Sequence, residues 1–599
     1  MNGRILNGTE SWTQDRFLQE AAAWLPDLTR DAPIESIRQS VLARVNRIHF
    51  ETYDEEGGLH DLDLVVVRDC ARAWRGLLHP RSERIAGHET LQALVDVARG
   101  LPRDDLSPNF WAEICHLIRG LEGRERLHDG DSLEVPGGLS GRDAARYRSS
   151  ELDRLGLDVA ARIGRYEDGL SRAAMERRER RCREVRETLV ATPREWSDWR
   201  WQVRHVVRTS EQLARLAPLS ADERAGIDRA VANRVPFGVT PYYASLLDDE
   251  PGGTRDRPLR AQVIPPGDYV DALCSAEVRE AYDFMQEADT SPVDLITRRY
   301  VGIVILKPYN ACPQICVYCQ RNWEIDEPMA RGAAASPEAL THALEWLGEH
   351  PAIHEVLVTG GDPLVLPDSQ LKRVLDRLAA IPHVERIRIG SRTPVTLPMR
   401  ITPALARLLG SYREPGRREV CVVTHVQHPY EVTPDLVGAV DRLRRRGISV
   451  YNQLVFTFYI SRCFEAAALR RLLRRCGIDP YYTFNPKGKE ETASYRVPIA
   501  RLVQEQKEEA RLLPGLARTD EPVFNVPGLG KNPLNAWQHR DLISIAPDGA
   551  RLYEFHPWEK KIGAQRTYVA RDVPILEYLR RLEAIGEDVS EYRGIWYYF

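Results

Sequence analysis

Three cysteines in one short stretch, Cys312, Cys316 and Cys319, have the residue type and spacing of a metal-cluster site. Their C-x3-C-x2-C pattern follows the apolar run 301–306, which places the thiols in a loop after a strand. Three thiolates are one ligand short of a closed zinc site or a four-cysteine cluster, and the next cysteine, Cys421, is about a hundred residues further on. The spacing therefore indicates a [4Fe–4S] cluster with one open iron. A zinc or redox pair, and three buried thiols, are the alternatives.

Other residues with useful chemistry also follow predicted strands. Gly360 and Gly361 come directly after an apolar run, and paired glycines let a backbone approach a ligand closely. Polar side chains follow later runs in Gly390-Ser-Arg392, Thr424-His425 and Asn485-Pro-Lys487. Because loops at the carboxyl ends of parallel strands face one mouth, we expect them to converge on a single site.

The elements that position these loops alternate between apolar strands and amphipathic helices from Arg298 onward. The strands are predicted at 301–306, 355–358, 386–389, 420–424, 449–455 and 480–484. The intervening helices are predicted at 337–349, 369–380, 402–409, 434–445 and 464–475. This alternation predicts an α/β fold whose parallel sheet curls into a partial (β/α)6 barrel.

The remaining segments are predicted to be largely helical. Residues 1–190 form a mostly helical N-terminal extension of unknown role, with helices at 17–28, 63–78, 91–101, 110–121 and 143–189. A helical segment of the core follows at 191–290, the barrel at 291–500 and a C-terminal segment at 501–599. The last segment begins with a charged helix that ends near Leu513. It then forms a hairpin, 542–545 with 550–555, around an Asp548-Gly549 turn.

Composition limits the function classes. The chain has 599 residues, 43% of them hydrophobic, which is ample for packed cores. No stretch approaches the ~18 apolar residues of a membrane span and residues 1–15 do not resemble a secretion signal, so we expect no membrane partner and a cytoplasmic protein. The net charge of −4 gives no sign of a nucleic-acid partner.

Taken together, residues 194–560 resemble the lysine 2,3-aminomutase family of radical S-adenosylmethionine (SAM), pyridoxal 5'-phosphate (PLP) enzymes. The resemblance rests on ordered motifs, among them the cysteine loop, Val358-Thr-Gly-Gly-Asp-Pro-Leu364, Arg388-Ile-Gly-Ser-Arg392, Thr424-His425 and the Pro-Gly-x-Gly-Lys531 loop. It implies an isomerase that holds a [4Fe–4S] cluster, SAM and PLP and moves an amino group from C2 to C3 of an amino acid. It also implies a homo-oligomer and an external electron donor such as flavodoxin or ferredoxin.

The resemblance further implies roles for single residues. The three cysteines would bind the cluster, and Lys531 would hold PLP covalently. Arg321 would pair with the substrate α-carboxylate, and Arg299 would lie near the PLP phosphate. The other cofactor contacts would come from Gly360, Gly361, Asp362, Ser391, Arg392, His425 and Gln453.

The expected substrate is L-glutamate, which would give β-glutamate. Lysine-specific members place two aspartates around the distal ammonium of the substrate, but this chain has Lys487 and Asn525 at the matching positions. A charge-assisted bond from Lys487 to a distal carboxylate contributes on the order of 1.5–3 kcal/mol, with Asn525 as a second donor. Lys489 is the alternative to Lys487 in register. The rival hypotheses are the same chemistry on lysine, arginine, aspartate or a secondary-metabolite precursor, and a non-catalytic scaffold that keeps the cluster.

Overall fold

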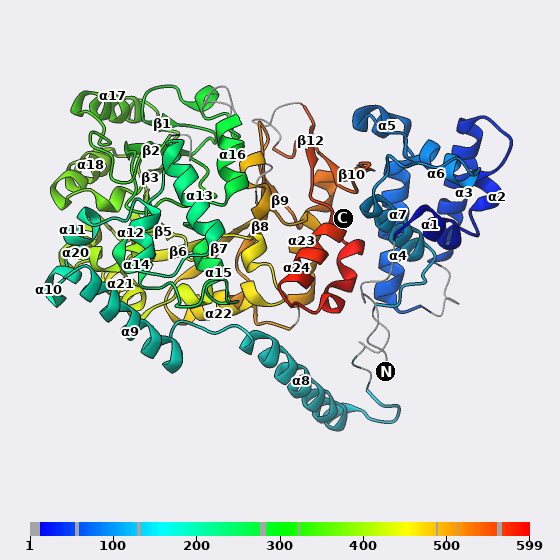
Figure 1. Ribbon diagram of the computed structural model, residues 1–599, viewed down its shortest axis with the longest axis horizontal. Helices are drawn as coiled ribbons and strands as arrows, with labels where there is room; N and C mark the ends of the chain where they lie inside the picture. The colour runs from blue at the N-terminus through cyan, green and yellow to red at the C-terminus, as the bar shows by residue number, and fades with distance from the viewer. Residues whose placement is uncertain are drawn as a thin grey trace.

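The computed structural model describes residues 12–53, 59–127, 133, 135–275, 283–321, 324–486, 489–510, 512–559 and 566–599. In these residues the centre of the fold is a nine-stranded sheet whose strands lie side by side in chain order (Figure 1). The strands are β1 (Ile296–Thr297), β2 (Ile303–Tyr309), β3 (Glu355–Gly360), β4 (Arg386–Gly390), β5 (Glu419–Thr424), β6 (Ser449–Val455), β7 (Asp479–Phe484), β8 (Glu521–Val526) and β9 (Gly530–Pro533). From β2 to β8 all pairings are parallel, whereas β1 and β9 are antiparallel to their neighbours.

The six predicted strands correspond to β2 through β7, so the predicted α/β class and parallel sheet are confirmed. The prediction missed β8, which adds a seventh parallel strand beside β7 in the described residues. Its second residue is Pro522, which a strand tolerates near its start although proline usually signals a loop. The segment that leads to Lys531 is consequently the hairpin β8–β9 and not a loop.

The predicted crossover helices are also confirmed, with ends that differ by a residue or two. They are α17 (Pro337–Gly348), α18 (Asp368–Ala380), α20 (Pro403–Ser411), α21 (Pro434–Arg444) and α22 (Glu465–Arg475). Most begin at a hydroxyl cap; Ser336, for example, accepts a hydrogen bond of 3.1 Å from the amide of Ala339. Their buried residues are largely leucine, valine and alanine, which pack against the sheet.

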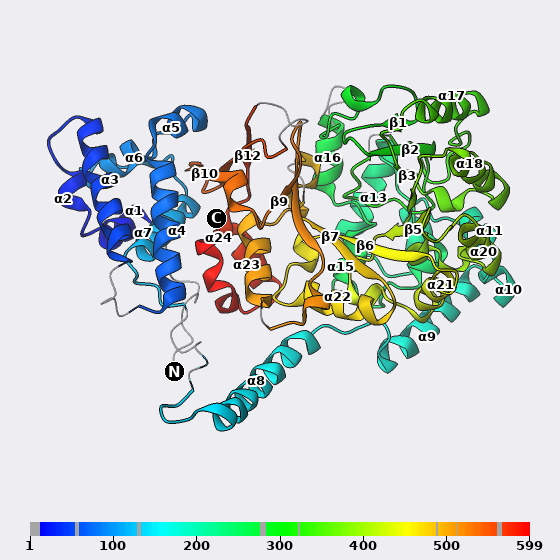
Figure 2. The ribbon, with the colours of Figure 1, turned by 180° about the vertical axis from the view of Figure 1, so that it is seen from behind.

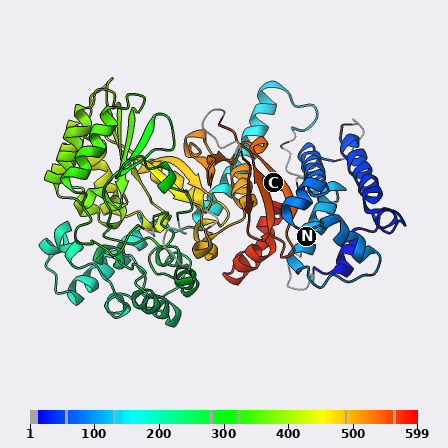
Figure 3. The ribbon, with the colours of Figure 1, turned by 90° about the horizontal axis from the view of Figure 1, so that it is seen from above.

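Shorter helices precede the sheet, as the sequence predicted for this segment. They are α10 (Pro193–Trp196), α11 (Trp199–Arg204), α12 (Ser210–Ala214), α13 (Ala221–Ala232), α14 (Pro241–Ala244), α15 (Arg257–Ala261) and α16 (Gly267–Ser275). They cover the side of the sheet that Figure 3 shows below the strands. The domain boundaries at 190, 290 and 500 stay a prediction.

The N-terminal region is helical, as predicted, but its helices are divided differently. They are α1 (Gln14–Glu20), α2 (Leu25–Leu28), α3 (Ile34–Glu51), α4 (Asp61–Leu77), α5 (Pro80–Ala86), α6 (Thr90–Ala98) and α7 (Pro108–Leu121). The single helix predicted at 143–189 is wrong, because α8 (Gly141–Gly164) and α9 (Arg172–Thr188) are separate. Between them the side chain of Tyr166 turns inward and donates a 2.6 Å hydrogen bond to the Cys463 carbonyl.

The N-terminal helices pack against the end of the chain (Figures 1 and 2). This C-terminal part contains α23 (Ile499–Glu509), β10 (Arg540–Ile545), β11 (Arg551–Phe555), β12 (Tyr568–Arg571), α24 (Ile575–Ala584) and the 3-10 helix η10 (Val589–Tyr597). The predicted hairpin is confirmed as β10–β11, with β12 as a third strand. Glu113 of α7 forms a buried 3.0 Å ion pair with Arg551 of β11. The described helices include none whose length and apolarity would let it cross a membrane.

Candidate active site

A cavity of ≈ 370 Å³ lies where the carboxyl ends of the parallel strands meet the cysteine loop. The structure brings most of the predicted site residues to its wall. These are Cys312, Cys316, Cys319, Arg321, Gly360, Gly361, Asp362, Ser391, Arg392, His425, Gln453 and Asn525. Lys489 also lines the cavity, whereas Lys531 and Arg299 are not among the lining residues, and Lys487 lies outside the described residues.

The glycine pair fixes the position of the cysteine loop. A methyl group on Gly361 would lie 2.3 Å from the Ala311 carbonyl oxygen, so only glycine lets the two backbones come this close. Gly360 has a φ of +107°, in the region that favours glycine. The amide of Asp362 donates to the Ala311 carbonyl at 3.0 Å, which ties the loop after β3 to the cysteine loop.

The three thiols form no disulfide and lie in a site that disfavours their charged form. Burial, then Asp362 and the neighbouring thiols, raise the pKa of Cys312 well above its usual value, and burial also raises the pKa of Cys319. Bound iron would supply the positive charge that thiolates need here. In the described residues no three His, Cys, Asp or Glu side chains gather closely enough for one metal ion. A [4Fe–4S] cluster with one open iron needs three cysteine thiolates, and the cavity wall has three cysteines.

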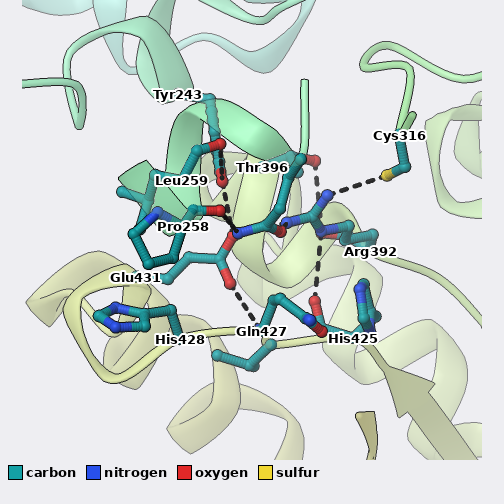
Figure 4. Close-up of polar contacts among 12 residues, drawn as sticks. Tyr243, Pro258, Leu259, Cys316, Arg392, Thr396, His425, Gln427, His428 and Glu431 are labelled. Atoms are coloured by element: carbon teal, nitrogen blue, oxygen red, sulfur yellow. Dashed lines mark hydrogen bonds and ion pairs between the residues drawn. The ribbon is translucent and has the colours of Figure 1, made fainter. Parts of the chain in front are cut away.

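Arg392 links the cysteine loop to the interior of the protein (Figure 4). Its Nη1 donates to Cys316 Sγ at 2.9 Å, and its Nη2 lies 2.6 Å from a carboxylate oxygen of Glu431. Glu431 is fully buried and also accepts from the Tyr243 hydroxyl at 2.8 Å. Sequence reasoning missed Glu431, although it lies only six residues after His425, because only its contacts with Arg392 and Tyr243 reveal its place in the site.

The carboxylate of Asp362 accepts its hydrogen bonds from other groups of the protein. It accepts hydrogen bonds from the Ser391 hydroxyl at 2.6 Å and from the amides of Arg392 and Thr393 at 2.9 Å each. It also accepts from the amide of Leu364 at 3.1 Å. Asp362 therefore connects the loops after β3 and β4 and has little capacity left for a ligand.

Arg321 and Arg299 meet at a buried glutamate that the sequence did not single out. Glu287 is 3% exposed and lies 3.0 Å from Arg321 and 3.3 Å from Arg299. Arg321 also lies 3.4 Å from a carboxylate oxygen of Glu324. A guanidinium has five N–H donors, so Arg321 can keep both glutamates and still donate to a carboxylate in the cavity. The Nε atom of Arg299 is buried and has no hydrogen-bond partner in the described residues. Such a donor is expected where the protein binds an anion.

Lys531 lies on β9 directly opposite Asn525 of β8. Opposed residues of an antiparallel pair share one face, so Lys531 lies on the hairpin face that Asn525 turns to the cavity. Its ammonium is 5.0 Å from the centre of the Tyr300 ring and 5.5 Å from that of Tyr482. Burial, then the positive charges of Arg388 and Arg299, lower the pKa of Lys531 to about 8. A lysine with this pKa is readily neutral, and only the neutral amine adds to an aldehyde.

Comparison with known proteins places the chain in a family. Residues 306–460 match the model of the radical SAM superfamily. A KamA family protein of Methanocaldococcus jannaschii, itself uncharacterised, is 43% identical over 93% of this chain and 91% of its own length. The chain belongs to the KamA family. An alignment of this length includes most of the N-terminal helices, so they are not peculiar to this chain.

Other KamA relatives have names that state a reaction. The L-lysine 2,3-aminomutase of Acetoanaerobium sticklandii is 32% identical over 52% of this chain and 71% of its own length. The glutamate 2,3-aminomutase of Clostridioides difficile is 29% identical over 71% of this chain and 97% of its own length. Radical SAM membership implies a [4Fe–4S] cluster, SAM and an external reductant, and KamA aminomutases, which are isomerases, depend on PLP.

The residues present fit these groups. Three unpaired thiols face one cavity, as a cluster with an open iron requires. Lys531 offers a buried amine of lowered pKa, and Arg299 offers a buried guanidinium nearby.

Proposed function

We propose that this chain is a KamA-family aminomutase that converts L-glutamate to β-glutamate. The observation that carries the proposal is the charge of the cavity wall. Asp362 is the only acidic residue among the described residues that line the cavity, and its oxygens are bonded to the protein. A lysine substrate would find no carboxylate for its distal ammonium there, and an unpaired buried charge is costly.

The positive groups of the wall suit a substrate with two carboxylates. Arg321 would bind the α-carboxylate, and its contact with Glu287 would orient the guanidinium. Asn525 is 8% exposed and would donate to the distal carboxylate. Lys489, paired with Glu491 at 2.6 Å, lines the same cavity, and Lys487 is the further donor that the sequence suggests.

Each cofactor has residues that would hold it. The three cysteines would bind the cluster, the loops of Gly360–Asp362 and Ser391–Arg392 would border SAM, and Lys531 would hold PLP with Arg299 near its phosphate. When bound, the cluster and SAM supply hydrogen-atom transfer, and the PLP ring stabilises an unpaired electron during amino migration. Lys531, with a pKa of about 8, would exchange a proton with the substrate amine as that amine replaces it. Family membership also supports the expectation of a cytoplasmic homo-oligomer that receives electrons from flavodoxin or ferredoxin.

Product analysis tests the proposal. After anaerobic cluster reconstitution, the enzyme is given SAM, PLP, a reductant and an equal mixture of glutamate, lysine, aspartate and arginine. We expect β-glutamate as the rearranged product. Another β-amino acid would keep the chemistry and refute glutamate as the substrate. Formation of 5'-deoxyadenosine without any rearranged amino acid would also refute glutamate and would point to a substrate outside the mixture.

Substitution of Asn525 tests the pocket itself. We expect Asn525→Asp to lower kcat/KM for glutamate by about tenfold or more, because a like charge would face the distal carboxylate. The matched control is Asn535→Asp, at an exposed position after β9. Equal activity of the two variants on glutamate would contradict the assignment of Asn525, and Lys487→Asp provides the same test for Lys487.

A further inference from the structure

The side chain of Arg392 places a positive charge directly against one of the three cysteine sulfurs. Its Nη1 donates to Cys316 Sγ at 2.9 Å. By comparison, the sulfur of Cys319 accepts a hydrogen bond of 3.4 Å from the uncharged main-chain amide of Arg321. The proposed reaction assigns Arg392 to the border of SAM and leaves its contact with the sulfur unexplained.

The other N–H groups of Arg392 are largely bonded to the protein. Its Nε donates to the His425 carbonyl at 3.3 Å, and its Nη2 donates to the Gln262 side chain and, at 2.6 Å, to Glu431. In the described residues these contacts leave one N–H of Nη1 for a ligand in the cavity, which Arg392 lines. The guanidinium is therefore held in one orientation, with its charge next to the sulfur.

Glu431 supplies a compensating negative charge from outside the cavity wall (Figure 4). It is the last residue of the 3-10 helix η5 (Pro429–Glu431), which follows β5, and it is fully buried. Its carboxylate accepts from the Tyr243 hydroxyl at 2.8 Å and, through its other oxygen, from the Gln427 amide at 2.7 Å. Both oxygens are thus bonded to the protein, and the carboxylate acts on the cysteine loop through Arg392.

Fixed charges near an iron–sulfur cluster change how readily it accepts an electron. Net charge, hydrogen bonds to the cysteine sulfurs and solvent exposure set the reduction potential. Reduction adds a negative charge, so a cation beside a sulfur stabilises the reduced form and raises the potential, whereas an anion lowers it. Salt screens such charges weakly where they are buried. Arg392 and Glu431 therefore act in opposite directions.

We propose that Arg392 and Glu431 together set the reduction potential of the [4Fe–4S] cluster that radical SAM membership implies. Arg392 raises the potential through its hydrogen bond to Cys316. Glu431 is a positioning residue, which orients the guanidinium and cancels part of its charge. This inference rests on the cluster and not on the substrate, so it holds whichever amino acid the enzyme rearranges.

Redox titration of the full-length protein tests the proposal, with the cluster reconstituted anaerobically and with neither SAM nor an amino acid present. Electron paramagnetic resonance of the reduced cluster gives the midpoint potential. We expect Arg392→Gln to lower the potential and Glu431→Gln to raise it. Each shift should be about 59 mV or more, which is a tenfold change in the equilibrium constant for one-electron reduction.

Glu113→Gln is the matched control, since it removes a buried carboxylate that pairs with Arg551 outside the cavity wall. It should leave the potential unchanged. Arg392→Lys and Glu431→Asp keep the charges, so each should retain part of the potential that the glutamine variant changes. These two variants also test the proposal if a glutamine variant does not take up the cluster.

The sign of the shifts separates this role from a purely structural one. The proposal is overturned if the variants of Arg392 and Glu431 leave the potential unchanged, or if both move it in the same direction, as a general loosening of the site would do. The titration involves no turnover, so this proposal and the proposed aminomutase reaction can fail separately.

Discussion

At the scale of single residues, Lys531 has the clearest physical signature in the chain. An exposed lysine is almost fully protonated at neutral pH, whereas burial and two neighbouring arginines lower the pKa of Lys531 from 10.5 to about 8. Tyr300 fixes the backbone at this position, since its hydroxyl accepts a 3.2 Å hydrogen bond from the Lys531 amide. The side chain is therefore placed and activated by residues that are far from it in sequence.

This pKa predicts how PLP capture depends on pH. The rate at which PLP-free protein takes up PLP should rise as pH increases through about 8 and then level off, because only the neutral amine reacts. Stopped-flow absorbance of the bound cofactor measures the rate. Arg388→Gln removes a positive charge, so the pKa should rise and the midpoint should move to higher pH.

Two variants complete this test. Arg148→Gln, on the exposed surface of α8, should leave the midpoint where it is, and Lys531→Ala should abolish the visible band of bound PLP. A midpoint near that of an ordinary lysine in the wild-type protein would contradict the described environment of Lys531.

At the scale of elements, the loop after β3 acts as a support for the cysteine loop. We expect Gly361→Ala to displace that support, because the added methyl group would lie 2.3 Å from the Ala311 carbonyl oxygen and neither backbone can give way cheaply. The iron content after reconstitution should fall several-fold, measured by a colorimetric assay. Gly348→Ala, where a methyl group meets nothing within 4 Å, is the matched control. Full iron content in both variants would show that the contact is dispensable.

The sequence predicts elements well where pattern and burial agree. Strands β2 to β7 are apolar runs buried by neighbours on both sides, and each is followed by an amphipathic helix of ordinary length. Prediction from the sequence fails where the local residue pattern favours a different structure from the one that tertiary packing imposes. Pro522 lowers the strand propensity of β8. The continuous pattern of charged residues over 143–189 gives no sign of the turn between α8 and α9, where Tyr166 donates a hydrogen bond to Cys463.

Some residues of the candidate active site could be predicted from the sequence and others could not. Residues that follow the strands, such as Cys316 and Arg392, could be predicted because the topology of a parallel sheet alone brings strand ends together. Glu287 and Glu431 could not, since each is recognisable only by the arginine that it contacts. Glu431 lies close to His425 in the sequence, but nothing in the pattern of residues shows that its side chain turns toward Arg392.

At the scale of the whole molecule, the N-terminal helices pack against the C-terminal part of the chain, and the buried ion pair of Glu113 with Arg551 joins them. Glu113→Gln should leave the Arg551 guanidinium buried and uncompensated, which costs about 3 kcal/mol. We expect the first urea transition, followed by far-UV circular dichroism of the N-terminal helices, to move to lower urea concentration. The iron content should not change, because the cysteine cavity is lined by other elements.

Glu187→Gln, at an exposed position of α9, is the control and should change stability by less than about 0.5 kcal/mol. Identical transitions for Glu113→Gln and the wild-type protein would mean that the pair contributes nothing to the attachment of the N-terminal helices.

The same ion pair has a consequence for how the protein is made. Glu113 and Arg551 are separated by 438 residues, and His116 on the same helix stacks on Trp596 at 4.3 Å. At synthesis rates of about 5–20 residues per second, roughly 20–90 s pass between the appearance of the two charges at the ribosome. During that interval α7 is complete but has no partner for Glu113. The helices that are synthesised first are thus among the last to reach their final packing.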